Sequence, residues 1–148
     1  MGSLKGILQH WQAFSRLLPR IAGAFRQSRA DALLKTAIES TPNGLCIFDA
    51  DLRVVVSNSH FAGMYGLVPA ETQAGTPLSE ILARRIETSC CPDNEADYLA
   101  DCLEKARCQE TLHTTYELKS GNVIAVERHP MPNGGVIQVH PDGTGARL

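Results

Sequence analysis

Apolar side chains recur at intervals of three and four positions over residues 3–27. This spacing gathers them on one face of an α-helix whose other positions are polar or basic. The apolar face contains Leu4, Ile7, Leu8, Trp11, Phe14, Leu18, Ile21 and Phe25. Pro19 lies inside the segment and cannot donate an intrahelical hydrogen bond, so we expect a kink or a break near Leu18.

The rest of the chain alternates between runs typical of strands and runs typical of helices. Ser28 is expected to cap a further helix, which Thr41-Pro42-Asn43-Gly44 ends. Strands are predicted over residues 45–48, 53–56, 112–118, 123–128 and 136–140, and helices around residues 61–65, from Pro77 and from Asp93. The order β-β-α-α-α-β-β-β predicts an α+β fold, in which helices cover one face of an antiparallel sheet.

Charge is divided unevenly along the chain. Residues 1–30 carry five basic and no acidic side chains, whereas the remainder carries nine basic and sixteen acidic ones. A nucleic-acid partner would require a basic face on the folded body, so we expect none. Only the N-terminal segment is suited to an anionic surface.

Length and cysteine content indicate one domain in a reducing compartment. A chain of 148 residues can bury one substantial core, and no apolar stretch approaches the ~20 residues that span a bilayer. The five cysteines, an odd number without a CxxC pair, are typical of a cytoplasmic protein. We therefore expect a cytoplasmic protein that touches a membrane at most peripherally.

Several short motifs follow one another in a characteristic order. They are Gly44-Leu45-Cys46-Ile47-Phe48-Asp49, Asn58, residues 61–66, Pro69, Gly75-Thr76-Pro77-Leu78 and Met131-Pro132-Asn133-Gly134-Gly135. With the element order, they resemble the PAS family, especially the bacterial PAS domains joined to diguanylate cyclases or histidine kinases. The resemblance extends over about residues 33–142.

The resemblance implies a five-stranded antiparallel sheet whose concave side and helices enclose a pocket for a small molecule or cofactor. Many members instead serve mainly as dimerisation modules. Candidate pocket residues are Phe48, Asn58, Phe61, Tyr65, Ile81, Tyr98, Val126, Gln138 and His140. His140 is the best candidate for a ligand contact, because flavin-binding light-oxygen-voltage relatives have a pocket-facing glutamine at this position. By strand alternation, the side chain of Gln138 lies on the same face. A strand-edge hydrogen bond for His140 and a simple helix cap for Asn58 are the alternatives.

Two cofactors common among relatives are not expected, and the cofactor is left unknown. The Asn-Cys-Arg-Phe-Leu-Gln motif that forms a covalent flavin adduct does not occur, and residues 77–109 contain no histidine that could serve as an axial haem ligand. Cys90 and Cys91 could be redox-active or simply small buried hydrophobes. The five histidines show no zinc-site spacing, so no metal is predicted.

The two ends of the chain suggest where a signal would leave the domain. Pro141, Gly143 and Gly145 would break the C-terminal signalling helix usual in the family. The N-terminal apolar face could instead pair with a second copy, pack on its own sheet, or lie at an anionic membrane surface. Its large apolar side chains each gain about 1.5–3 kcal/mol on burial, so some partner is required.

These observations predict three segments: a basic amphipathic helical segment over residues 1–30, a PAS-like domain over 31–142, and a tail over 143–148. The predicted function is a signal-transduction module that senses a small ligand or cofactor, dimerises through its N-terminal helices, or does both. A homodimer or a signalling protein is the expected partner. The alternatives are a ligand-free protein–protein adaptor and a small α+β enzyme, although no phosphate loop or nucleophile elbow is visible.

Overall fold

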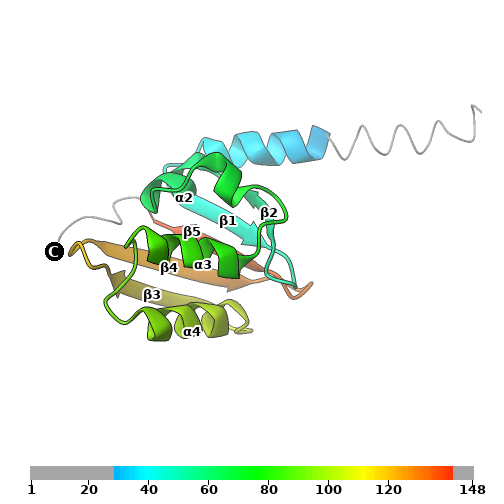
Figure 1. Cartoon of the computed structure of the whole chain (residues 1–148). Helices are drawn as coiled ribbons and strands as arrows, with labels where there is room; N and C mark the ends of the chain where they lie inside the picture. Colours follow the sequence, from blue (N-terminus) through cyan, green and yellow to red (C-terminus); the bar gives the residue numbers. More distant parts are fainter. Residues whose placement is uncertain (1–28, 142–148) are drawn as a thin grey trace, which may run out of the picture. The chain divides into compact units, whose positions relative to one another are not determined.

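A computed structural model of the chain describes residues 29–141 (Figure 1). The predicted apolar face from Leu4 to Phe25 and the predicted tail over 143–148 lie outside these residues. Residues 29–39 are helical, and the chain divides into two compact units between Thr36 and Ala37. Within residues 29–141, no helix is both long enough and apolar enough to cross a membrane.

Five strands form one antiparallel sheet in the order β2-β1-β5-β4-β3. Their bounds are β1 Gly44–Phe48, β2 Val54–Ser57, β3 Leu112–Glu117, β4 Val123–Pro130 and β5 Val136–His140. The predicted α+β fold is confirmed, with strand limits shifted by one or two residues. Because β1 pairs with β5, the first and last strands lie together at the centre of the sheet.

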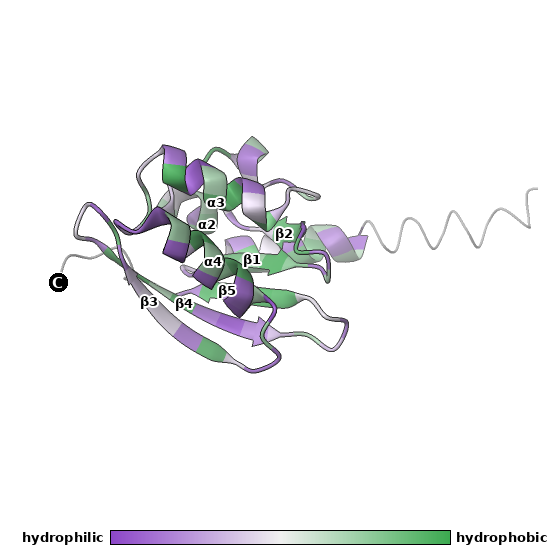
Figure 2. Cartoon of the chain, turned by 60° about the horizontal axis from the view of Figure 1, so that its bottom comes forward, coloured by the Kyte–Doolittle hydropathy of each residue, from purple (hydrophilic) through white to green (hydrophobic). Residues whose placement is uncertain are grey.

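The helices lie together on one face of this sheet (Figure 2). They are α2 Ser59–Met64, the short 3-10 helix η1 Pro69–Thr72, α3 Leu78–Glu87 and α4 Glu95–Ala106. Two predicted helix starts need adjustment. Pro77 is the residue that caps α3 and not its first helical residue. Asn94, whose side chain accepts from the Asp97 amide, caps α4 in place of Asp93, and η1 was not predicted.

The turn between β1 and β2 explains why a hairpin forms there. Asp49 Oδ1 accepts hydrogen bonds from the amides of Asp51 and Arg53, at 2.9 and 3.0 Å, which folds the chain back on itself. Leu52 adopts a φ of 57°, a conformation that is unfavourable for leucine. Burial of its side chain offsets that strain.

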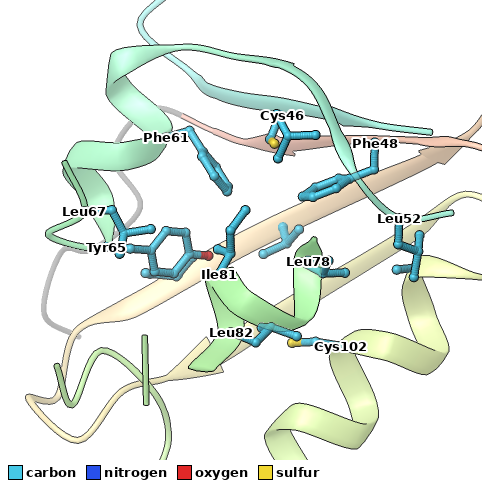
Figure 3. Packing of buried hydrophobic residues seen from close by; sticks show 14 of the residues in the cluster. Cys46, Phe48, Leu52, Phe61, Tyr65, Leu67, Leu78, Ile81, Leu82 and Cys102 are labelled. Atoms are coloured by element: carbon cyan, nitrogen blue, oxygen red, sulfur yellow. The ribbon is translucent and has the colours of Figure 1, made fainter. Parts of the chain in front are cut away.

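The core fills the space between the sheet and the helices. Alternation along β1, β4 and β5 turns every second side chain toward the helices. In Figure 3, Phe61 and Tyr65 from the α2 segment, Ile81 from α3 and Cys46 and Phe48 from β1 point toward one another. All five side chains are at most 1% exposed.

Candidate functional site

A cluster of buried polar side chains interrupts the apolar core on the inner face of the sheet. Its members come from four elements: Arg85 from α3, Tyr98 from α4, Arg128 from β4, and Gln138 and His140 from β5. Each is at most 4% exposed. Buried polar groups are costly unless they are hydrogen-bonded, so such a cluster is a candidate site.

His140 lies at the centre of an aromatic arrangement. Its Nε2 shares a hydrogen bond of 2.6 Å with the hydroxyl of Tyr65, which ends α2. The rings of Phe61 and Tyr65 each meet the imidazole edge-on, with centroids 5.3 Å away. The end of the last strand is therefore fixed directly to α2.

The environment keeps both members of this pair uncharged. Burial lowers the pKa of His140 well below 6.5, and the positive charges of Arg85 and Arg128 lower it further, while the Gly44 backbone acts in the opposite direction. Burial also raises the pKa of Tyr65 above its usual value, although Arg85 opposes that shift. The hydrogen bond therefore joins a neutral imidazole to a neutral phenol.

Arg85 is buried although it carries a permanent charge. Its guanidinium stacks over the Tyr65 ring, 3.5 Å from the centroid, and Nη1 donates to the Tyr98 hydroxyl at 3.2 Å. Cation–π stacking stabilises a desolvated guanidinium by about 2 kcal/mol. The Nε and Nη2 atoms have no hydrogen-bond partner among the residues that the structure describes.

Arg128 is the second buried guanidinium and lies opposite Gln138 in the β4–β5 pairing. It donates to the hydroxyls of Thr114 and Tyr116, at 3.4 and 3.2 Å. The Tyr116 hydroxyl donates in turn to Asp101 Oδ2 at 2.8 Å. The Tyr116 hydroxyl thus bridges Arg128 and the Asp101 carboxylate.

A groove beside α4 borders this cluster. Its volume is about 440 Å³, and its lining includes Tyr98, Asp101 and Tyr116. The two tyrosine rings meet edge-on at 5.1 Å. Each tyrosine therefore lines the groove, and its hydroxyl accepts a hydrogen bond from a buried arginine.

Asn58 joins the segments that surround α2. Its Oδ1 accepts from the amides of Leu45 and Phe61, and its Nδ2 donates to the carbonyls of Ile38 and Asn43. The predicted cap of α2 is confirmed by this geometry. Because the side-chain amide already makes four hydrogen bonds, its observed role is to hold β1, α2 and residues 38–43 together.

The start of α2 is also tied to the helix that precedes the sheet. The amide and hydroxyl of Ser59 donate to the two carboxylate oxygens of Glu39, at 2.9 and 2.6 Å. Since Tyr65 at the other end of α2 contacts His140, this six-residue helix connects the polar cluster to residues 38 and 39.

All nine predicted pocket residues are buried, at no more than 4% exposure. The structure brings His140, Tyr65 and Phe61 into direct contact and places Gln138 on the same strand face, as strand alternation predicted. Their role as ligand contacts remains a prediction.

Sequence reasoning missed the two buried arginines. Neither Arg85 nor Arg128 is among the nine residues predicted to line the pocket. The signal was present: Arg85 continues the apolar stripe of Leu78, Ile81 and Leu82, and Arg128 continues the inward alternation of β4. Both residues could have been predicted to be buried, because each arginine occupies an inward-facing position of its helix or strand.

The cysteines and acidic groups do not form a second centre in the part of the chain that the structure describes. All five cysteines are reduced. Cys91 is inaccessible to solvent, and burial raises the pKa of its thiol, which opposes thiolate chemistry. No group of three or more histidine, cysteine, aspartate or glutamate side chains within residues 29–141 is arranged to hold a metal.

The fold and the cluster together define a class: an α+β domain in which one antiparallel sheet and a short helical segment enclose a partly polar interior. A family model described as the PAS fold matches residues 38–147. The chain therefore belongs to the PAS family, whose members are sensor modules of signal transduction. No curated protein matches the chain.

Solved structures share the fold of this chain at low identity. The PAS domain of BvgS from Bordetella pertussis is 15% identical, with a TM-score of 0.55, over 76% of this chain and 85% of that one. The DhaR(N)–DhaL complex of E. coli is 17% identical, with a TM-score of 0.54, over 84% and 40%. The phage VqmA–DPO complex is 15% identical, with a TM-score of 0.52, over 84% and 56%.

Proposed function

We propose that this PAS domain senses a small molecule bound at the inner face of its sheet and reports it through α2 to the helix that precedes the domain. One observation carries the proposal: α2 contacts the polar cluster at one end, through Tyr65 and His140, and residues 38 and 39 at the other, through Asn58 and Ser59. A change at His140 would therefore shift α2 and, with it, residues 38 and 39 at the end of the preceding helix.

Dimerisation through the N-terminal helices would turn that movement into a signal. The domain would act in a cytoplasmic protein, as a homodimer or with a signalling partner. One similar structure is described as a complex with DPO and another as a complex with DhaL. Both kinds of assembly agree with the proposal, which includes no enzymatic step.

A ligand-free adaptor is the second candidate function. The direct edge contacts among Phe61, Tyr65 and His140 favour it, because these rings pack against one another without an intervening molecule. Under this alternative, the cluster would only rigidify the domain.

Native mass spectrometry and absorbance of the purified full chain separate the two candidates. A small molecule that copurifies, or that is found by a thermal-shift screen, supports sensing. A protein that binds no compound in either experiment supports the adaptor.

The route through α2 is tested by hydrogen exchange of residues 37–40 with and without the molecule found in this way. We expect binding to change their protection in the wild type. Tyr65→Phe retains the ring but removes the hydroxyl that contacts His140. This variant should bind and yet lose most of the change, whereas an unaltered response would contradict transmission through α2.

A further inference from the structure

The two buried arginines make no direct contact with a carboxylate of residues 29–141. Arg85 is 3% exposed and Arg128 is 2% exposed. Neither forms an ion pair with a carboxylate among residues 29–141, whereas Arg84, Lys105 and Lys119 of that region do. The described part of the interior therefore holds two positive charges without a carboxylate in direct contact, and Asp101 is linked to Arg128 only by hydrogen bonds through Tyr116.

The unsatisfied groups of the interior share one chemical character. Among residues 29–141, the buried side-chain atoms without a hydrogen-bond partner are Arg85 Nε and Nη2, Arg128 Nε, Gln138 Nε2 and His140 Nδ1. All are nitrogens. The Gly44 backbone raises the pKa of His140, whereas the other four atoms are N–H donors that have no acceptor in this part of the chain. The site therefore has an excess of hydrogen-bond donors and positive charge, and it lacks acceptors and negative charge.

Arginine cannot relieve this situation by losing its proton, because its guanidinium stays charged in proteins. A buried charge that is neither paired nor fully hydrogen-bonded is strongly destabilising. The tyrosine hydroxyls beside Arg85 and Arg128 are neutral and supply one acceptor each. An anion would supply both missing elements, charge and acceptors.

We propose that the interior binds a small organic acid whose carboxylate accepts hydrogen bonds from Arg85 and Arg128. This proposal rests on the proposed function and names the ligand class of the same site. The two guanidiniums converge on one place, since they donate to the hydroxyls of Tyr98 and Tyr116, whose rings meet edge-on with centroids 5.1 Å apart. Gln138, paired with Arg128 across the sheet, provides a further donor.

The surroundings favour a carboxylate on an organic body over inorganic phosphate. Guanidinium forks match the planar geometry of a carboxylate. The side chains next to the cluster are apolar, including Phe61, Ile81 and Val126, all at most 2% exposed. These apolar side chains can pack against the hydrocarbon part of an organic acid, whereas they offer no hydrogen bonds to a fully hydrated ion. A bound cation is disfavoured by the two arginines themselves.

The neighbouring arginines of α3 provide a matched test. Arg84 is exposed and pairs with Glu71 and Glu87, whereas Arg85 points into the interior. Thermal unfolding of the dialysed full chain is measured in sodium formate and in sodium chloride at equal ionic strength. Formate is the smallest carboxylate and should enter any site for an acid. It should raise the Tm of the wild type and of Arg84→Met by about 4 °C relative to chloride.

Arg85→Met should lose this difference, and in chloride its Tm should equal or exceed that of the wild type because an unpaired buried charge is gone. Equal Tm values of the wild type in formate and chloride would overturn the proposal, as would an undiminished formate effect in Arg85→Met. Arg128→Met serves as the second variant if Arg85→Met does not fold, with the same expectations.

Mass analysis of the molecule released from purified protein separates this proposal from the one it rests on. A carboxylic acid supports both, and inorganic phosphate in its place overturns the organic-acid class. A neutral compound leaves sensing intact and overturns the acid. No bound molecule, together with no formate effect, overturns the acid and favours the adaptor.

Discussion

His140 links the chemistry of the interior to the stability of the domain. Burial and two nearby arginines hold its pKa well below 6.5 in the folded state. Between that lowered pKa and about 6.5, the unfolded chain binds the proton more readily than the folded one, so folding must weaken as pH falls. The stabilisation is complete above about pH 7.

Substitution of this residue should therefore change the acid sensitivity of the protein. From pH 7 toward pH 5, the free energy of unfolding of the wild type should fall with a contribution from His140 of up to about 1.4 kcal/mol per pH unit. His140→Gln keeps a partner for Tyr65 without titrating, so its denaturant-determined stability should decline less. The exposed His60→Gln is the control and should follow the wild type. Identical pH profiles for wild type and His140→Gln would contradict a neutral buried imidazole.

At the scale of elements, the contact between β1 and α2 requires a residue without a side chain. A Cβ on Gly44 would lie 3.0 Å from Met64 Sδ and 3.1 Å from the Phe61 Cα, closer than a packed side chain tolerates. The φ of this glycine is not the reason for its presence. The close approach lets Asn58 and Tyr65 reach their partners on either side.

Two alanine substitutions distinguish this close approach from general glycine effects. Gly44→Ala should lower the free energy of unfolding by about 1–3 kcal/mol, because α2 must shift away from β1. Gly63→Ala adds the same methyl group on α2 itself, where no atom lies within 4 Å. It should raise stability by about 0.5–1 kcal/mol through helix propensity. Equal effects of both substitutions in urea unfolding would show that β1 and α2 are not closely packed.

For the whole molecule, the N-terminal apolar face predicts an assembly. If that face packed against a second copy, its large apolar side chains would be removed from water, which is favourable. The same contact would join two PAS domains through the segments that precede them. The basic residues of the segment also suit an anionic membrane surface, which remains the competing interpretation.

Neighbouring residues on opposite sides of this predicted helix provide the test. Trp11→Glu places a charge on the apolar face, whereas Gln12→Glu places the same charge on the polar face. Sedimentation of the full chain should give a dimer for the wild type and Gln12→Glu, and a monomer for Trp11→Glu. A monomeric wild type that binds anionic liposomes, with binding lost in Trp11→Glu, would support the membrane interpretation instead.

Local patterns were sufficient to predict most of the fold. Period-two alternation located β4 and β5, and helical spacing located α3 and α4, because such periods reflect which side of an element is buried. The cap of α4 and the 3-10 helix at Pro69 were less predictable, since several neighbouring polar or proline residues satisfy the same local rule. The cap at Asn58, given as the alternative to a pocket role, is observed, but the hydrogen bonds of Asn58 to Ile38 and Asn43 depend on how distant segments meet.

The sequence by itself determined the family, the order of elements and the inward-facing side chains, because these follow from residue periodicity and short motifs. Only the tertiary structure decided that Tyr65 and His140, 75 positions apart, share a hydrogen bond. It alone revealed that Arg85 and Arg128 are buried and make no direct contact with a carboxylate of residues 29–141. A pattern records whether a position is buried, whereas the charge balance of an interior depends on which elements converge there.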